Sequence, residues 1–311
     1  VRIPADATRV YDYVFVGCAN LYEAIIPDGV GSIGESAFAN CHNLMDVSIP
    51  DSVGYIYDNA FESCSSLTEV VLPDSVVKLS YHAFENCENL TEVTLSENLG
   101  SIYNYVFAGC SSLKSIDIPQ NVASISANAF TGCTSLERVS LPSDLEEIDW
   151  YAFAGCSSLE EINIPDSVSR LYPYAFSGCS RLKNIHIPNA IPGIEHYVFY
   201  DCASLTEVTL PGSITYINEA AFSGCSSLNS IRIPDGVTII EKAAFSRCTS
   251  LNSVRIPSSV TEIGSSAFSR CTSLKSVSIP YGVPSIAPYT FARCESLESV
   301  TIPSSVQSIG T

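Results

Sequence analysis

Two residue types recur in this chain with a fixed period of 23 residues. All thirteen cysteines lie on this period, from Cys18 to Cys294, and all thirteen phenylalanines lie three residues earlier, from Phe15 to Phe291. Self-similarity at a fixed period of about 20 to 50 residues is typical of solenoids and other repeat architectures, and it outweighs chain length as a guide to domain number. The sequence therefore predicts one small structural unit per 23 residues, stacked many times.

One repeat reads "PSSVTEIGSSAFSRCTSLKSVSI" over residues 257–279. Thirteen such repeats follow one another from residue 4, with a partial repeat at each end and no insertion or deletion between them. We therefore predict a single repeat domain over residues 1–311. Because the chain begins at "VRIP" and ends at "SVQSIGT", both in mid-pattern, we also expect it to be a segment of a longer protein.

The apolar spacing inside a repeat predicts its local structure. The alternation in "V-x-I" (277–279) is typical of a half-buried strand, and "V-x-x-I" (260–263) suggests a second, shorter extended piece. The closer spacing in "AFSRCTSL" (267–274) favours a tight helical or 3₁₀ turn. A unit this short cannot bury its own apolar side chains, so the units must stack, with strands about 4.8 Å apart. The fold class is thus a mainly β repeat solenoid.

The pattern "P-x-x-V-x-x-I-x-x-x-A-F-x-x-C-x-x-L-x-x-V-x-I" closely resembles the BspA-like, or Treponema pallidum-type, leucine-rich repeat family over essentially all of the chain. The resemblance implies a right-handed leucine-rich repeat with a parallel sheet on its concave side. It also implies a secreted or cell-surface, adhesin-like protein, and some relatives are associated with fibronectin and fibrinogen binding. One departure is that only Gly34, Gly264 and Gly310 supply the glycine that many relatives carry after "V-x-x-I".

Three functions are compatible with this resemblance. The first is a non-enzymatic module that binds an extracellular or cell-surface protein, such as a matrix glycoprotein, through the concave face. The second is a structural spacer that displays another domain, and the third is a carbohydrate-binding surface. The sequence does not indicate the oligomeric state.

The net charge of −18 argues against nucleic acid as the main partner, because phosphate binding needs a basic face. The charge is also uneven: residues 1–155 carry 21 acidic and 5 basic side chains, whereas residues 156–311 carry 12 and 10. The longest apolar runs are only a few residues, so we expect no membrane insertion of this segment.

The cysteine column has three possible roles: metal ligands, disulfides or core filler. Zinc sites need ligands at short spacings such as C-x-x-C, and none occurs. Neighbouring coils could approach disulfide distance, but the side chains would point in parallel and their number is odd. We therefore expect buried, reduced thiols and no metal or cofactor. "GVGSIG" (29–34) matches a dinucleotide-binding pattern, but Val30 and Ile33 are core positions of the repeat and no long helix follows.

Nothing in the sequence points to an enzyme. The four histidines, His42, His82, His186 and His196, fall in separate repeats, and no serine or cysteine has the context of a catalytic triad. Carboxylates are abundant, but enzymes on such scaffolds usually build their sites on loops that interrupt the coil, and this chain has none.

Arginine supplies the first set of candidate binding residues. Arg247, Arg270 and Arg293 occupy one position in three successive repeats, and Arg232 and Arg255 share an outward strand position. Neighbouring cations about 5 Å apart repel one another unless an anion compensates. One interpretation is a solvated face near acidic side chains such as Glu295 and Glu298, and the other is a patch for an acidic ligand. His186 occupies the same outward strand position as Arg232 and joins the candidate set.

Tyrosine supplies the second set. Most tyrosines precede the "AF" corner, and the candidates are the pairs Tyr103/Tyr105 and Tyr172/Tyr174. Rows of aromatic side chains suit protein or sugar recognition, because they offer a large contact area at low entropic cost. The alternative is that these tyrosines pack on their neighbours along the edge of the solenoid.

Overall fold

The computed structural model describes residues 1–310, which contain only short strands and turns and no helix long and apolar enough to cross a bilayer. Three-residue strands form one side of the coils: β1 (Glu23–Ile25), β3 (Asp46–Ser48), β5 (Glu69–Val71), β7 (Glu92–Thr94), β9 (Ser115–Asp117), β11 (Arg138–Ser140), β14 (Asn184–His186), β15 (Glu207–Thr209), β17 (Ser230–Arg232), β19 (Ser253–Arg255), β21 (Ser276–Ser278) and β23 (Ser299–Thr301). Two-residue strands form another: β2 (Ser32–Ile33), β4 (Tyr55–Ile56), β6 (Lys78–Leu79), β8 (Ser101–Ile102), β10 (Ser124–Ile125), β12 (Glu147–Ile148), β13 (Arg170–Leu171), β16 (Tyr216–Ile217), β18 (Ile239–Ile240), β20 (Glu262–Ile263), β22 (Ser285–Ile286) and β24 (Ser308–Ile309). We call their outer surfaces the long-strand face and the short-strand face.

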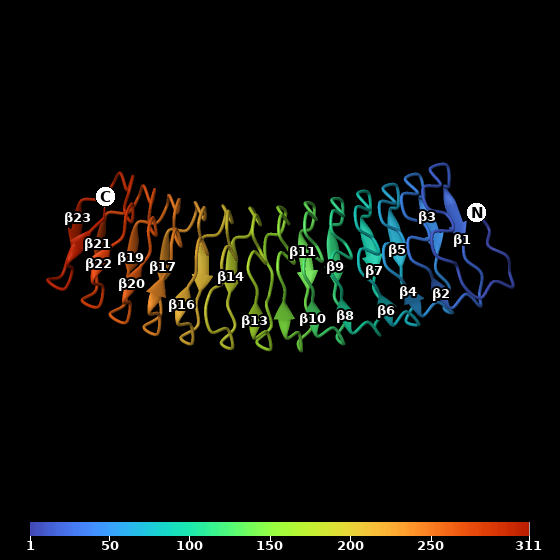
Figure 1. Cartoon of the computed structure of the whole chain (residues 1–311), viewed down its shortest axis with the longest axis horizontal. Helices are drawn as coiled ribbons and strands as arrows, with labels where there is room; N and C mark the ends of the chain where they lie inside the picture. The colour runs from blue at the N-terminus through green and yellow to red at the C-terminus, as the bar shows by residue number, and fades with distance from the viewer. Residues whose placement is uncertain (311) are drawn as a thin grey trace. The chain divides into compact units, whose positions relative to one another are not determined.

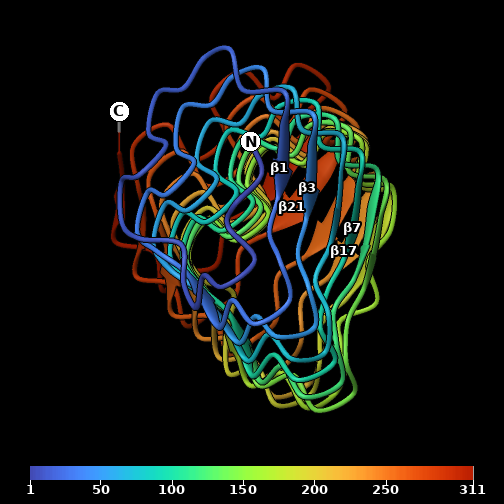
Figure 2. The same ribbon diagram turned by 90° about the vertical axis from the view of Figure 1, so that its right-hand side faces the viewer.

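The chain forms two compact units, Val1–Pro165 and Asp166–Thr311, and each is a parallel β-solenoid. In unit 1 the pairing advances by one repeat at each step, so that Ala24 lies opposite Val47 and Val70 opposite Val93. Strands β1, β3 and β7 line one side of its coils, as the view along the stack shows (Figure 2). Unit 2 keeps the same register, with β17, β19, β21 and β23 in one sheet and β16, β18 and β20 in another (Figure 1).

Both strand predictions are confirmed. The central residue of a long strand points inward, as for Val47 at 6 % exposure, while its two neighbours are exposed. The second residue of a short strand is buried, as for Ile56 and Ile263. Val30 and Ile33 of the "GVGSIG" stretch are both fully buried in the core, and the stretch contains the short strand β2 where a nucleotide-binding fold would begin a helix.

The phenylalanines form a continuous stack inside each unit. In unit 1, Phe61 lies between Phe38 and Phe84, with ring centroids 5.3 and 5.1 Å away and ring planes within 5° of parallel. In unit 2, Phe245 lies 5.5 Å from Phe222 and 5.4 Å from Phe268. Ring stacking adds to the burial of apolar area, so the phenylalanine column forms one continuous part of the core of each unit.

The cysteines act as small core residues. The thiol of Cys87, for example, donates a 3.2 Å hydrogen bond to the carbonyl oxygen of Phe61, 26 residues earlier, and the same bond recurs along the column. Burial raises the pKa of the Cys133 and Cys248 thiols to about 12, because an apolar environment disfavours the thiolate. These side chains are therefore held as neutral thiols.

The corner around "AF" is built from single turns and not from a helix. Cys41 and Ala39 each donate to the carbonyl oxygen three residues earlier, which is the 3₁₀-type bond that the spacing predicted. Left-handed residues such as Ser36 and Asn40 interrupt the run, so no helical segment forms within residues 1–310. The corner is thus a chain of isolated turns.

Candidate binding surfaces

Each corner contains two residues with positive φ. One lies two residues before the phenylalanine, which we call the pre-Phe position, and the other lies directly before the cysteine, which we call the pre-Cys position. The backbone N–H groups of these two residues, and of the phenylalanine between them, point along the stack: Ser36, Phe38 and Asn40 donate to carbonyl oxygens of the next coil at 2.9, 2.8 and 2.7 Å. The left-handed conformation therefore gives the corner its own ladder of hydrogen bonds between coils.

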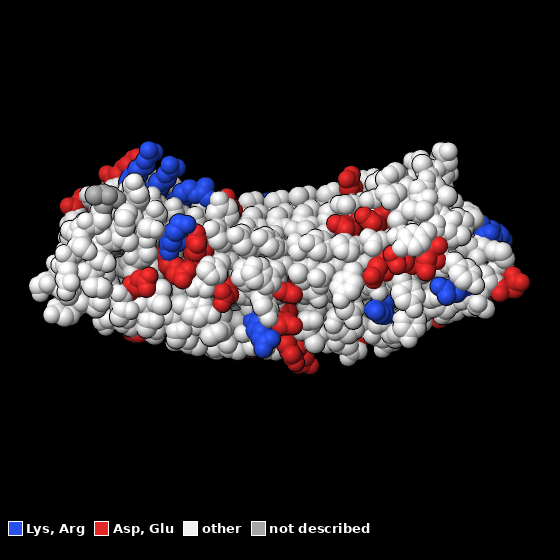
Figure 3. Space-filling model, viewed as in Figure 1, with Lys and Arg blue, Asp and Glu red and all other residues white. Residues whose placement is uncertain are grey.

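Arg247, Arg270 and Arg293 all occupy the pre-Cys position, with φ of 62°, 60° and 60°. The sequence-based prediction that they share one position in successive coils is confirmed by the corner ladder, in which Arg247 donates to Ser269 and Arg270 to Ala292. Figure 3 shows basic side chains in a row at the upper edge of the C-terminal coils. Arg270 and Arg293 are exposed and form no ion pair with any residue among 1–310.

Arg247 differs from the other two because it is anchored. Its Nη2 donates a 2.6 Å hydrogen bond to Oδ1 of Asp201, and its guanidinium lies 5.5 Å from the ring centre of Tyr200. Asp201 lies two coils away, and Gly224 occupies the coil between them. A Cβ on Gly224 would overlap Asp201 Oδ1 and lie 3.1 Å from Arg247 Nη2, so the glycine leaves the space through which this ion pair forms.

On the long-strand face of unit 2, Arg232 lies directly opposite Arg255 in the parallel pairing of β17 and β19. Arg255 has a partner, since its Nη2 lies 3.6 Å from Oδ1 of Asp235. Arg232 is exposed and has no ion-pair partner among residues 1–310. His186, the third strand candidate, is exposed and lies opposite Thr209.

A shallow hollow of about 590 Å³ lies beside Arg232, and Thr209, Gly212 and Asp235 are among the residues that line it. Gly212 creates the space, because it stands one repeat before Asp235 and a Cβ there would meet no atom within 4 Å. The hollow therefore combines an unpaired guanidinium with a hydroxyl and a neighbouring carboxylate.

The tyrosine candidates pack along the corner edge. Tyr105 stacks on His82 with centroids 4.7 Å apart, and Tyr103 meets Tyr81 edge-on at 5.3 Å. In unit 2, Tyr174 stacks on Tyr197 at 4.6 Å, with ring planes 3° apart.

The four candidate tyrosines, including Tyr172, are half-buried, and these contacts fit the packing interpretation. More surface is available on Tyr281 and Tyr289 of unit 2, which are 73 % and 64 % exposed. The sequence analysis did not single out these two, and a role of any of these rings in recognition stays a prediction.

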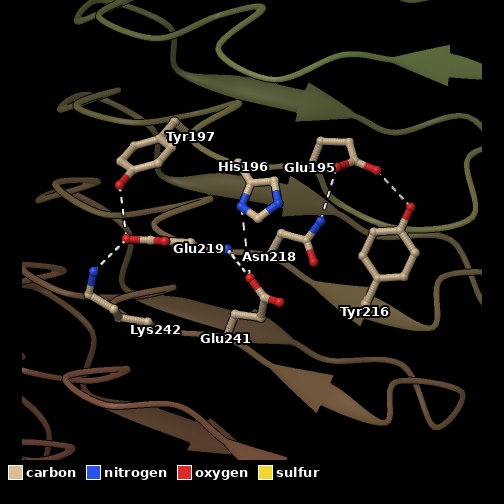
Figure 4. Close-up of polar contacts among 8 residues, drawn as sticks. All are labelled: Glu195, His196, Tyr197, Tyr216, Asn218, Glu219, Glu241 and Lys242. Atoms are coloured by element: carbon tan, nitrogen blue, oxygen red, sulfur yellow. Dashed lines mark hydrogen bonds and ion pairs between the residues drawn. The ribbon is translucent and has the colours of Figure 1, made fainter.

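The structure also reveals a polar network that the sequence analysis missed (Figure 4). It lies in unit 2, in three successive repeats, and its residues directly follow "V-x-x-I" except for Tyr216, which lies within that stretch in β16. In its first half, Oη of Tyr216 donates to Glu195 Oε1 at 2.7 Å, and Nδ2 of Asn218 donates to Glu195 Oε2 at 3.0 Å. Burial and the Glu195 carboxylate together raise the pKa of Tyr216 to about 12.

The second half of the network is centred on Glu219. Its Oε1 accepts hydrogen bonds from Tyr197 Oη at 3.0 Å and from Lys242 Nζ at 2.8 Å, and its own N–H donates to Glu241 Oε2 at 2.9 Å. Lys242 lowers the pKa of Glu219, whereas burial and the Glu219 carboxylate raise the pKa of Tyr197 to about 12. His196 Nδ1 lies 3.8 Å from Glu241 Oε2. Every carboxylate here has a partner, so the network links three successive coils along the corner edge.

Charge is divided between the units. Unit 1 carries 23 acidic and 5 basic residues, a net of −18, whereas unit 2 carries 10 of each. On the long-strand face of unit 1, four successive coils present exposed carboxylates, with Glu23 opposite Asp46 and Glu69 opposite Glu92. Among residues 1–310, no group of three or more histidine, cysteine or acidic side chains is placed to hold a metal ion.

These features define a leucine-rich repeat solenoid, in which a constant interior supports exposed side chains that differ from coil to coil. Residues 1–114, 100–228 and 192–311 match the model of the BspA type leucine-rich repeat region, and the chain belongs to this family. The family is a general protein-binding repeat fold.

Solved structures agree with this assignment. A leucine-rich repeat protein from Bacteroides ovatus is 29 % identical, with 99 % of this chain and 91 % of that chain covered and a TM-score of 0.66. A leucine-rich cell surface protein from Faecalibacterium prausnitzii is 28 % identical, with 96 % and 86 % covered and a TM-score of 0.58. The pneumococcal vaccine antigen PcpA shares the fold at 20 % identity, with 100 % and 80 % covered and a TM-score of 0.56. No curated protein matches the chain.

Proposed function

We propose that this chain is the non-enzymatic, protein-binding part of a secreted or cell-surface, adhesin-like protein. Its partner would be an extracellular or cell-surface protein, such as a matrix glycoprotein, bound through the long-strand face, which is the concave face of the sequence-based prediction. Support for the location comes from the similarity to a cell surface protein of Faecalibacterium prausnitzii. Support for the activity comes from the family, whose repeats commonly bind proteins.

The observation that carries the proposal is the in-register pair Arg232 and Arg255 on the long-strand face. Like charges directly opposite one another destabilise a sheet, and of the two arginines only Arg255 has a carboxylate within ion-pair distance among residues 1–310, that of Asp235. Arg232 therefore lacks an ion-pair partner among residues 1–310, and it lies next to a hollow with room for a side chain of a bound protein. An acidic side chain of that protein could form the missing ion pair with Arg232.

A non-enzymatic role is part of the same proposal, and the polar network of the corner edge supports it. Catalysis needs a nucleophile, acid or base held close to a substrate pocket. In the polar network, Glu195 already accepts hydrogen bonds from Tyr216 and Asn218, and Glu219 accepts them from Tyr197 and Lys242.

The test is a binding screen of the folded chain against immobilised matrix glycoproteins, fibronectin and fibrinogen among them, and against a glycan panel. We expect saturable binding to a protein. Arg232→Ser combined with Arg255→Ser should weaken it by up to about fivefold for each ion pair that the variant removes. Serine is the natural residue at this strand position in Ser48, Ser140 and Ser278, so the variant should fold normally.

Lys78→Ser is the matched control, because it removes a charge from the short-strand face, where Ser32, Ser101 and Ser124 already occur. Binding that Lys78→Ser weakens as much as the double variant would argue against a specific site. A glycan hit that depends on the tyrosine rows would favour the carbohydrate-binding alternative. Silence on both panels would favour a spacer that displays another domain.

A further inference from the structure

The pre-Cys position carries three arginines that the fold itself does not require. Thirteen coils use this position, and all thirteen residues have positive φ. Ten of them are residues that adopt the left-handed region readily or have short polar side chains: Gly17, Asn40, Ser63, Asn86, Gly109, Gly132, Gly155, Gly178, Asp201 and Gly224. The remaining three, Arg247, Arg270 and Arg293, we call the arginine ladder.

Arginine is a costly choice at this position. The left-handed conformation brings Cβ close to the following carbonyl oxygen, a clash that glycine avoids and that asparagine and aspartate partly offset by local hydrogen bonds. The contribution of this position to the corner is a backbone N–H bond to the next coil, and Gly109 and Gly132 form it at 2.8 Å as Arg247 does. The side chains of the ladder therefore add nothing to the corner hydrogen bonds.

The ladder is also electrostatically unsatisfied. Arg270 and Arg293 are exposed and unpaired among residues 1–310, and only Arg247 has an acidic partner, Asp201. The residues directly before them are small, namely Ser246, Ser269 and Ala292. Adjacent guanidiniums on successive coils repel one another, while the small neighbours leave them open to a partner. Strain and repulsion at one row of positions indicate a surface shaped for an anionic ligand.

We infer that the arginine ladder docks an acidic α-helix of a partner protein, with the helix axis along the stack of coils and one carboxylate per helical turn facing the arginines. This inference rests on the proposed protein-binding function and names a second contact surface for it. The ligand class is a helix with an acidic stripe, in which aspartate or glutamate recurs at three- and four-residue spacing.

The choice of a helix follows from the spacing of the coils. The rings of Phe245 and Phe268, two residues before Arg247 and Arg270 in the same corners, have centroids 5.4 Å apart, and the next interval, from Phe268 to Phe291, is 5.8 Å. The pitch of an α-helix is about 5.4 Å, so one carboxylate per turn stays level with one arginine per coil. In an extended peptide the side chains on one face recur about every 6.6–6.8 Å, and the match is lost along the ladder. A guanidinium and a carboxylate at the same height along the stack can form two parallel N–H···O bonds, because both groups are planar.

The test measures binding of three fluorescent peptides to the whole chain by anisotropy. The first is a helical peptide of about 20 residues with glutamate once per turn on one face. The second has the same composition with the glutamates spread round the helix, and the third carries prolines that prevent helix formation. We expect the striped helix to bind at least about tenfold more tightly than the other two. Binding should weaken steeply with salt.

The informative variant is Arg270→Gly combined with Arg293→Gly. It should lower affinity for the striped helix by about tenfold or more, since it removes two charge-assisted hydrogen-bonding groups. Because glycine suits positive φ, the same variant should unfold at an equal or higher denaturant concentration than the parent chain. A merely structural role for the arginines predicts the opposite, namely lower stability together with any loss of binding.

Arg232→Ser with Arg255→Ser is the control that separates this inference from the proposed function. This variant should leave the affinity for the striped helix unchanged, while it lowers the affinity for the protein found in the glycoprotein screen. Equal binding of all three peptides, equally tight binding of a sulfated oligosaccharide, absence of binding, or full binding by the Arg270→Gly, Arg293→Gly variant would each overturn the inference. None of these outcomes bears on the long-strand face.

Discussion

At the scale of single residues, the corner decides which side chains the fold accepts. Gly224 has φ of 84° and lies between Asp201 and Arg247, whose ion pair crosses its coil. We expect Gly224→Ala to destabilise the protein by about 1–3 kcal/mol, because the new Cβ is strained at this φ and overlaps Asp201. Urea denaturation followed by circular dichroism measures the change.

Gly212→Ala is the control for this prediction. Gly212 does not have positive φ, and a Cβ there meets no atom within 4 Å, so the substitution should be neutral or slightly stabilising. The cost at Gly224 arises from its backbone conformation and from the ion pair that crosses it, and Gly212 has neither. Similar losses of stability for both alanines would therefore contradict this explanation.

At the scale of the structural element, the phenylalanine stack provides the largest fully buried side chains of each unit. Phe61 is fully buried between two rings, and Phe61→Ala should cost about 3–5 kcal/mol, through lost apolar burial and the cavity that remains. Phe15 stacks on one neighbour only and is half-buried, so Phe15→Ala should cost clearly less. Denaturation midpoints of the two variants, measured side by side, check this order. Equal costs would mean that the stack does not transmit stability through neighbouring coils.

The sequence predicts these elements well because their periodicity is carried by apolar residues. "V-x-x-I" and "V-x-I" specify a short and a long strand, and the structure has β20 and β21 at those places in the 257–279 repeat. The corner was only partly predicted. Its 3₁₀-type bonds follow from the spacing of the apolar residues, whereas the alternation with left-handed residues depends on backbone bonds between coils. Frequent Gly and Asn at the pre-Cys position were the available signal.

The polar network shows why exposed sites are harder to predict than the core. Glu195, Asn218 and Glu241 share one position in three successive repeats, so an alignment of the repeats brings them into one column. Which of them bond to one another depends on side-chain reach across coils, as when Glu195 accepts from Tyr216 and Asn218. Periodicity gives the column, but only the three-dimensional structure gives the partners.

At the scale of the whole molecule, the cysteine column couples folding to pH. Burial raises the pKa of the Cys133 thiol in unit 1 and of the Cys248 thiol in unit 2 to about 12, whereas the pKa of a cysteine in an unfolded chain is about 8.5. The stability that this protonation contributes is fully present below about pH 8.5 and is lost as the pH rises toward the folded value. Each buried thiol should lower the free energy of unfolding by up to about 1.4 kcal/mol per pH unit in that interval.

Because buried thiols recur in nearly every coil, their slopes add, and we expect the protein to unfold cooperatively at moderately alkaline pH. Denaturant titrations under reducing conditions between about pH 8 and pH 9.5 measure the slope before tyrosines ionise. Cys110→Ala combined with Cys133→Ala removes two titrating groups and should make the slope shallower, even if the absolute stability falls. Cys18→Ala, which removes an exposed thiol near the start of the chain, is the control. Identical slopes for all three proteins would show that the column does not set the alkaline limit.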